Sequence, residues 1–108
     1  MKDRLTKEES ARLIELGVPK EMATGYITEL YHGETEYIDV FSLYDLLKIL
    51  PKMVGDSAIY IHTLADGNWS AMYYGFYYSC KIEKELIDAL YELLCLVIEN
   101  NYLKTEQL

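Results

Sequence analysis

The dipeptide Asp66-Gly67, placed between two aromatic runs, constrains the fold of this chain more than any other feature. Residues 58–64 read Ala-Ile-Tyr-Ile-His-Thr-Leu, and residues 69–78 read Trp-Ser-Ala-Met-Tyr-Tyr-Gly-Phe-Tyr-Tyr. Asp and Gly both tolerate the positive φ angles of a tight turn, and apolar runs on each side are typical of β-strands. The sequence therefore predicts an antiparallel β-hairpin that is rich in aromatic side chains.

Helical patterns lie on both sides of this hairpin. Thr6 and Glu9 have the spacing of a capping box at the start of a first helix, which Gly17 ends. Pro19 suits the first turn of a second short helix that reaches Ala23. Ser42 and Asp45 repeat the capping-box spacing before a Leu-rich helix over 43–50, and residues 82–100 predict one long helix.

The remaining stretches predict less regular structure. Residues 24–36 contain two glycines and read as a loop or a broken helix, whereas residues 37–41 read as an extended segment or a third strand. We therefore expect one α+β domain over residues 1–108. Its small antiparallel sheet is built on the aromatic hairpin and joined by short N-terminal helices and a Leu-rich middle helix, with the long C-terminal helix packed on the sheet.

The distribution of charge limits the partners that the chain can bind. The net charge is −8, and between Lys20 and Lys48 there is no basic residue but six acidic ones. Nucleic acids and anionic membranes require clustered Lys and Arg, so we expect neither as a partner. A basic protein remains open as a partner, as does nucleic-acid mimicry toward a basic protein, beside the reading that acidity only maintains solubility.

The sequence also predicts the cellular compartment of the protein. No apolar run is long enough to span a membrane, and the N-terminus has no apolar signal-peptide core. We therefore expect a cytoplasmic protein in which Cys80 and Cys95 are free thiols.

The register of the hairpin decides which side chains share a face. We expect Leu64 opposite Trp69, His62 opposite Ala71, and Tyr60 opposite Tyr73. One face would then be amphipathic and hold the candidate binding residues Tyr60, His62, Trp69 and Tyr73. The other face would be the core face, formed by Ile59, Ile61, Met72, Tyr74 and Phe76.

Three interpretations of the amphipathic face stay open. Residues 24–36 could cover it, a protein partner could bind it, or it could bind a flat ligand such as a sugar or a nucleobase. A slip of one residue in the register would exchange the two faces.

Catalytic and metal-binding interpretations are weak. His32 and His62 are thirty residues apart, and no His or Cys pair has the spacing of a metal site. His62 near Cys80 would lack a third group to orient the imidazole. We therefore expect no enzyme, no cofactor and no metal.

The long helix predicts an additional contact. Glu85, Asp88, Glu92 and Glu99 form one polar stripe, but Leu96 falls in the same stripe and the rest of the helix is apolar. A helix of this kind is covered on more than one side, either by the sheet and the helix over 43–50 or by a second copy of the chain as well. We expect a homodimer, in which Tyr91 and Leu96 would lie between the two chains.

Three stretches together resemble a family of short uncharacterised proteins from Bacteroides-type gut bacteria and their prophages and mobile elements. These stretches are residues 5–17, residues 41–52 (Phe-Ser-Leu-Tyr-Asp-Leu-Leu-Lys-Ile-Leu-Pro-Lys) and residues 86–101. The resemblance implies an accessory protein of a mobile element, without an assigned activity or catalytic residues. The expected function is a non-enzymatic protein–protein interaction module, with a small-ligand binder as the alternative.

Overall fold

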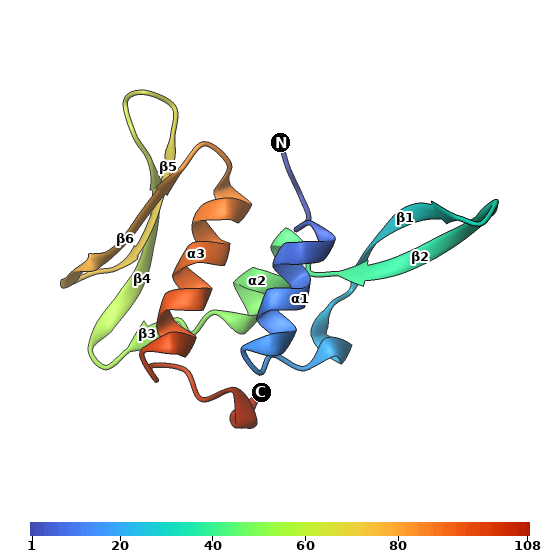
Figure 1. Cartoon of the computed structure of the whole chain (residues 1–108). Helices are drawn as coiled ribbons and strands as arrows, with labels where there is room; N and C mark the ends of the chain where they lie inside the picture. Colours follow the sequence, from blue (N-terminus) through green and yellow to red (C-terminus); the bar gives the residue numbers. More distant parts are fainter.

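The computed structural model describes the backbone of residues 1–108 and the side chains of all residues except 76–79. The chain forms three α-helices and two small antiparallel sheets, and its extents are 51 × 36 × 17 Å. Figure 1 shows the helices in the middle of the molecule, with one sheet on each side of them. The predicted α+β class is confirmed.

Helices α1 and α2 begin where their capping residues predict. Helix α1 spans Lys7–Glu15 and helix α2 spans Leu43–Ile49, and each begins with a complete capping box, from Thr6 and Ser42 respectively. A single 3₁₀ turn, Lys20–Met22, follows α1, and a second one, Thr105–Gln107, lies near the C-terminus.

The long helix is shorter than the sequence pattern predicted. Helix α3 spans Leu86–Glu99, whereas the prediction began at Ile82. Residues 82 and 83 instead form the end of a strand, because Ile82 pairs with Ser70 and Glu83 pairs with Trp69. Residues 82–85 contain a single apolar residue, Ile82, which suits a helix and a strand equally well, so periodicity alone could not place the boundary.

The larger sheet contains the predicted hairpin. Its strands are β3 (Met53–Val54), β4 (Ser57–Thr63), β5 (Trp69–Tyr73) and β6 (Phe76–Glu83), in the order β3-β4-β5-β6. The hairpin β4–β5 turns over residues 64–68, where the Gly67 amide donates to the Leu64 carbonyl at 2.9 Å. A second turn at Tyr74 and Gly75 divides the aromatic run into two strands, which the sequence analysis did not predict.

The smaller sheet corrects the prediction for residues 24–36. Strands β1 (Gly25–Tyr31) and β2 (Glu34–Val40) pair along their whole length. Their loop has only two residues, His32 with φ 49° and Gly33 with φ 80°. A two-residue loop with two positive φ angles matches the twist of the strands, so the segment is a β-hairpin and not a loop or broken helix.

This hairpin, called the ribbon below, projects from the body of the molecule. Figure 1 shows it on the side of the helices opposite the four-stranded sheet. Residues 24–36 therefore do not cover the aromatic hairpin, and that interpretation of its face was wrong. Seven residues per strand give the ribbon a length of roughly 20–24 Å.

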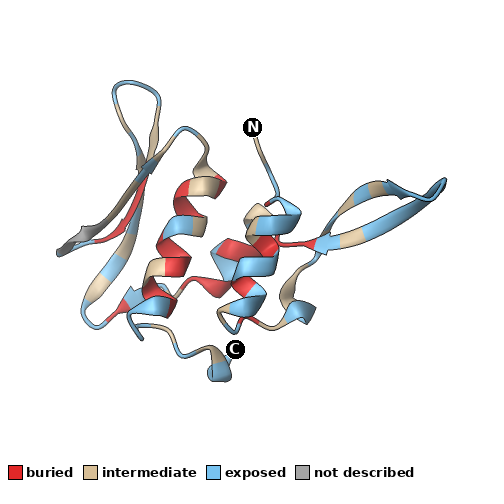
Figure 2. Ribbon diagram, viewed as in Figure 1, coloured by how far each residue is buried: buried red, intermediate tan, exposed pale blue. Residues whose placement is uncertain are grey.

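Helix α3 lies at the centre of the hydrophobic core. It contacts β5 and β6 on one side and α2 on the other. Figure 2 shows the buried residues concentrated on the helices and on β5, whereas the ribbon is exposed beyond its base. The fully buried side chains include Leu90 and Leu93 of α3, Leu46 of α2, Phe41, and Tyr73 of the sheet.

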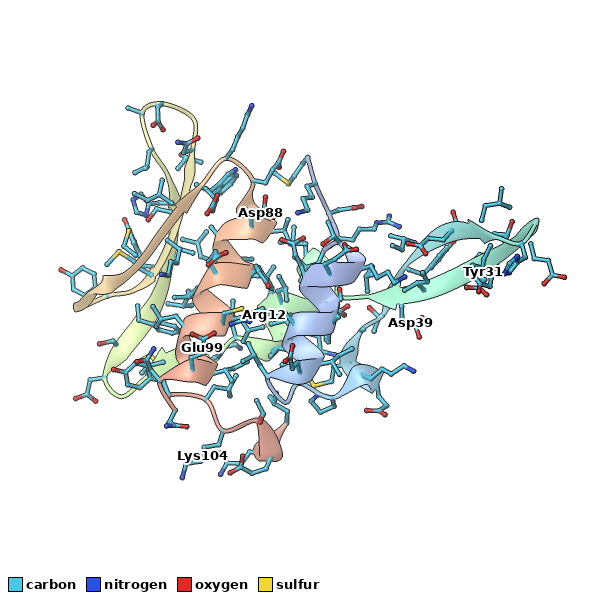
Figure 3. The ribbon with its side chains drawn as sticks, viewed as in Figure 1. Arg12, Tyr31, Asp39, Asp88, Glu99 and Lys104 are labelled. Carbon is cyan, nitrogen blue, oxygen red and sulfur yellow. The ribbon has the colours of Figure 1, made fainter. Side chains whose placement is uncertain are left out.

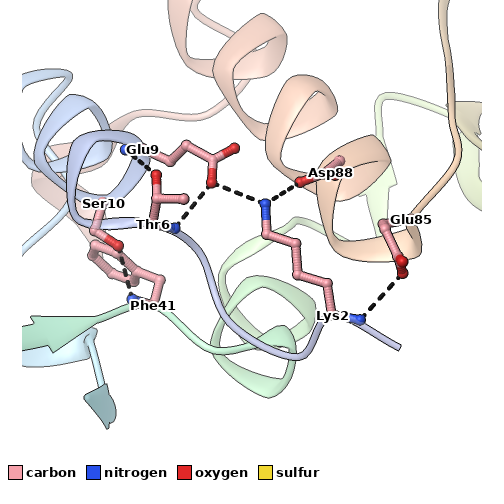
Figure 4. A network of polar contacts seen from close by, with 7 residues as sticks. All are labelled: Lys2, Thr6, Glu9, Ser10, Phe41, Glu85 and Asp88. Atoms are coloured by element: carbon pink, nitrogen blue, oxygen red, sulfur yellow. Dashed lines mark hydrogen bonds and ion pairs between the residues drawn. The ribbon is translucent and has the colours of Figure 1, made fainter. Parts of the chain in front are cut away.

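A polar network ties the N-terminal segment to two helices (Figure 4). The Lys2 ammonium donates to Glu9 of α1 at 3.1 Å and to Asp88 of α3 at 2.6 Å. The Lys2 backbone amide donates to the Glu85 carboxylate at 3.2 Å. The first turns of α1 and α3 are thereby held beside each other by one side chain.

Candidate functional site

The register of the aromatic hairpin differs by one residue from the predicted one. Tyr60 pairs with Met72 and His62 pairs with Ser70, whereas Tyr73 pairs with Ile59 and Trp69 pairs with Thr63. Directly paired residues share a face, so Tyr60 and His62 lie on one face and Trp69 and Tyr73 on the other. The predicted grouping of these four residues on one face was wrong.

The cause of the shift is the length of the turn. The prediction joined the strands through a loop of two or four residues, but the loop pairs Leu64 with Asn68 and so places three residues between them. A change of one residue in the loop exchanges the faces of one strand relative to the other. Asp66 stabilises this three-residue loop, since its carboxylate accepts a hydrogen bond from the Asn68 amide at 2.9 Å.

Tyr73 is a core residue and not a surface one. Its side chain is 1% exposed, and its hydroxyl donates a 2.6 Å hydrogen bond to the Pro51 carbonyl. Burial raises the pKa of this phenol far above its ordinary value, so it stays protonated. Together with Ile59, Ile61 and Ala71 it packs against the core on the face that α3 covers.

The opposite face, called the outer sheet face below, carries Tyr60 and His62. Their rings are 4.8 Å apart, and the Tyr74 ring lies 6.5 Å from that of Tyr60. Tyr74, predicted for the core face, is 64% exposed, and Tyr60 is 49% exposed. Phe76, which was predicted for the core face as well, lies outside the described side chains.

The register assigns further strand residues to the outer sheet face. Ser70 and Met72 are the direct partners of His62 and Tyr60 and are buried between their neighbours. The exposed apolar side chains that join Tyr60 and Tyr74 on this face are Met53, which pairs with Ala58, and Ile82, which pairs with Ser70. The structure thus gives an apolar face with tyrosine hydroxyls at its surface.

Among the side chains that the structure describes on this face, the polar groups lack the arrangement of a catalytic site. Ser70 Oγ lies 3.3 Å from Cys80 Sγ, and His62 is the cross-strand neighbour of Ser70. However, His62 Nδ1 is enclosed and has no hydrogen-bond partner among the described residues. A general base needs an accessible nitrogen and a group that orients its ring, and these contacts supply neither at Nδ1.

The ribbon is the second candidate surface. Glu29 pairs with Glu36 and Tyr31 pairs with Glu34, so three carboxylates share one of its faces. The other face carries Tyr26, Leu30 and Tyr37, together with threonines and Asp39. No basic residue occurs between Lys20 and Lys48, so the whole ribbon is acidic.

Four large apolar side chains of the ribbon are solvent-exposed. Leu30 is 77% exposed and Tyr37 is 70% exposed, and Tyr26 and Tyr31 are both more than half exposed. Figure 3 shows Tyr31 toward the tip of the ribbon and Asp39 toward its base. Sequence reasoning missed these residues as a surface, although two strand-like runs of seven residues around His32-Gly33 carried the signal.

The base of the ribbon is held firmly. The Arg4 guanidinium donates to the Tyr26 carbonyl at 2.7 Å. The Thr24 amide and hydroxyl donate to Asp45 at 2.8 and 2.7 Å. Farther out, the Lys7 ammonium lies 3.4 Å from Glu29, which is an exposed ion pair that contributes little stability. The ribbon is therefore positioned at its base and open along its length.

The homodimer contact was predicted to lie on α3, at Tyr91 and Leu96. Tyr91 and Leu96 are half-buried and pack against the core of their own chain. Together with Cys95, Arg12 and Lys81 they line a surface cavity of about 330 Å³. Arg12 and Glu99 close one side of it through a 2.7 Å ion pair, and Figure 3 shows these two side chains pointing toward each other.

Two side chains that line this cavity, Tyr91 and Cys95, hold their protons more tightly than usual. Burial raises the pKa of Tyr91 to about 12, and it also raises the pKa of the Cys95 thiol. A thiol in that state is a poor nucleophile at neutral pH. The cavity therefore offers a mixed-charge depression without an activated side chain.

A second cavity of about 400 Å³ lies between α1 and the ribbon. It is lined by Ala11 and Ile14 of α1 and by Tyr37 and Ile38 of β2, with Lys7 and Lys20 among its polar residues. Neither this cavity nor the one on α3 is lined by Tyr60, His62, Trp69 or Tyr73.

Among the described side chains, no three His, Cys, Asp or Glu residues lie in an arrangement that could hold a metal ion. Within the described part of the chain, no helix has the length and apolar character needed to cross a bilayer. Comparisons with protein-family models, curated proteins and solved structures find no match.

Proposed function

We propose that this protein is a non-enzymatic protein–protein interaction module whose contact element is the ribbon. The supporting observation is that the ribbon projects from the body while exposing Tyr26, Leu30, Tyr31 and Tyr37. A two-stranded hairpin alone is only marginally stable in water, and exposed tyrosines contribute much of the energy at protein interfaces. Such an element gains stability when a partner covers it.

The charge of the ribbon supports a basic partner. Glu29 and Glu36 lie directly opposite each other, and like charges in a direct cross-strand pair destabilise a hairpin. Glu34 adds a third carboxylate on the same face. A Lys or Arg side chain of a partner that lies between these carboxylates would remove the repulsion and form charge-assisted hydrogen bonds.

The resemblance stated above adds a proposal about the biological setting. If the chain belongs to that mobile-element family, then the partner is a protein of the bacterial host or of the element itself. Nucleic-acid mimicry is the special case in which the partner is a nucleic-acid-binding protein, because its basic surface would accept the carboxylates of the ribbon.

The small-ligand alternative has less support from the geometry. It required Tyr60, His62, Trp69 and Tyr73 on one face, and the register divides them between two faces. Trp69 lies on the face toward α3, where Glu83 pairs with it. We therefore retain the interaction module as the proposed function.

A pull-down with matched charge variants tests this proposal. The ribbon variant Glu34→Lys, Glu36→Lys changes the net charge as much as the control variant Glu92→Lys, Glu106→Lys, and all four residues are exposed. We expect the wild type and the control to retain a basic protein from bacterial lysate at about 50 mM salt, and the ribbon variant to lose it. Raising the salt to about 300 mM should weaken the retention, because exposed charges are screened.

Two results would contradict the proposal. One is a partner retained equally by the wild type and by the ribbon variant. The other is a partner lost equally from the ribbon variant and from the control, since net charge rather than the ribbon would then be responsible. Circular dichroism of each variant shows whether the fold is intact before either result is interpreted.

A further inference from the structure

The outer sheet face is an exposed apolar surface on the side of the molecule away from the ribbon. Figure 1 shows the helices on only one side of the four-stranded sheet. The exposed members of the outer sheet face are Met53, Tyr60, Tyr74 and Ile82, each about half exposed or more. An exposed apolar face of this kind is a candidate interaction site in a folded protein.

This face differs from the rest of the molecule in its charge. The described strand residues on it are Met53, Ala58, Tyr60, His62, Ser70, Met72, Cys80 and Ile82, and none of them is Asp, Glu, Lys or Arg. The chain as a whole has a net charge of −8. A basic partner would find no carboxylate on this face to pair with.

The lack of charged side chains on the described strands of the outer sheet face favours a second copy of this chain as its partner. Net charge keeps copies of a protein apart, because most approaches bring carboxylates close together. The ribbon would be an unfavourable contact between copies, since Glu29, Glu34 and Glu36 would meet the same residues of the other chain. On the outer sheet face two copies can meet without opposing any carboxylates.

We propose that two copies of this chain pack through their outer sheet faces in an isologous dimer. Each copy then places Tyr60 and Tyr74 against the same face of the other, in the manner of two sheets packed about 10 Å apart. The ribbons project away from this contact and stay free for another partner, so the dimer does not depend on the proposed function of the ribbon.

The size of the face limits the strength of the dimer. Strands of two, seven, five and eight residues, at about 3.4 Å per residue and about 4.8 Å apart, give a face of about 350 Å² per copy, or about 700 Å² for both. This area falls in the range of weak, transient complexes. We therefore expect monomer and dimer to exchange, with the dimer populated only at high protein concentration.

Sedimentation equilibrium over about 10 µM to 1 mM tests the dimer. The wild type should rise from the monomer mass of 12.6 kDa toward twice that mass. Two double variants place like charges on the face: Tyr60→Lys, Tyr74→Lys and Tyr60→Glu, Tyr74→Glu. Each should dimerise at least tenfold more weakly alone, and a mixture of the two should restore the dimer.

Matched controls distinguish the outer sheet face from the ribbon. The variant Tyr26→Glu, Tyr37→Glu adds two charges to exposed tyrosines of the ribbon and should dimerise like the wild type. As a measurement that needs no variant, dilution should shift the amide NMR signals of β4 and β5 but not those of the ribbon.

Three results would overturn the proposal. The first is a wild type that stays monomeric up to about 1 mM. The second is a dimer that the ribbon control weakens and the sheet variants do not. The third is a mixture of the Lys and Glu variants that fails to dimerise although both are folded, because a face that packs against its own copy must respond to opposite charges.

Discussion

Asp45 shows how a single residue can connect several parts of the fold. It is 2% exposed, and its carboxylate accepts hydrogen bonds from the Ser42 amide and from the amide and hydroxyl of Thr24. It thereby completes the capping box of α2 and holds the base of the ribbon. Burial alone would raise the pKa of Asp45, but these hydrogen bonds outweigh burial and lower it.

The lowered pKa predicts how the contribution of Asp45 depends on pH. Its folded-state pKa lies below the ordinary aspartate value of 3.8, so its stabilisation is fully present above that value and is lost as the pH falls through the folded pKa. The variant Asp45→Asn should be about 1–2 kcal/mol less stable than the wild type at pH 7. This difference should shrink below about pH 4.

Urea unfolding of both proteins at several pH values measures this difference. Asp56→Asn, in the exposed β3–β4 turn, is the matched control and should stay close to the wild type at each pH. A constant difference between Asp45→Asn and the wild type from pH 7 to pH 3 would show that the Asp45 carboxylate does not lose its contribution on protonation.

The ribbon is an element whose local sequence and environment disagree. Its β-strands and two-residue turn are well formed, yet it places Glu29 opposite Glu36 and leaves its tyrosines in solvent. Proteins depart from local rules of this kind mainly at functional positions. The ribbon is anchored at its base, where Val40 is fully buried and the Phe41 amide donates to Ser10 Oγ at 3.1 Å.

A shortened ribbon should therefore leave the body of the protein folded. Replacing residues 27–38 with Asn-Gly would join Tyr26 to Asp39 through a tight hairpin turn. Since residues 27–38 contribute no fully buried side chain, we expect the melting temperature to change by only a few degrees. By contrast, Val40→Ala at the base should cost about 2 kcal/mol.

Thermal unfolding followed by circular dichroism compares the shortened chain with Val40→Ala. A shortened chain that fails to fold would mean that the ribbon belongs to the cooperative core. In that case the charge variants of the ribbon would have to be interpreted through stability as well as through binding.

At the scale of the whole molecule, α3 joins the parts into one unit. It contacts β5 and β6 on one side and α2 on the other, and the Lys2 network ties its first turn to α1. Leu90, at the middle of α3, is fully buried. Removing core volume at this point should therefore destabilise the sheet and the helices together.

The variant Leu90→Ala tests this coupling. We expect a loss of about 2–5 kcal/mol and a melting temperature lower by about 10 °C or more. Leu47→Ala, at a partly exposed position of α2, should cost about 1 kcal/mol or less. Far-UV circular dichroism reports on the helices, and Trp69 fluorescence reports on the sheet. Coincident transitions would indicate one cooperative domain, whereas separate transitions would show that the sheet unfolds independently.

Local signals in the sequence determined the elements of this protein. The capping boxes at Thr6 and Ser42, the stop at Pro51 and the hairpin at Asp66-Gly67 each depend on residues that are close in the chain, and the structure confirms them. The ribbon was missed although its signal was also local, because glycines around a tyrosine-rich run suit a broken helix as well as a two-residue turn.

Only the tertiary structure decided which side chains share a surface. Each β-strand has two faces, so a change of one residue in the length of the loop between β4 and β5 moved Trp69 and Tyr73 to the core side and left Tyr60 and His62 outside. The placement of the ribbon away from the sheet likewise depends on long-range contacts of Asp45 and Arg4. The candidate surfaces could not be predicted from neighbouring residues, because register and docking are set by the packing of segments that are distant in the sequence.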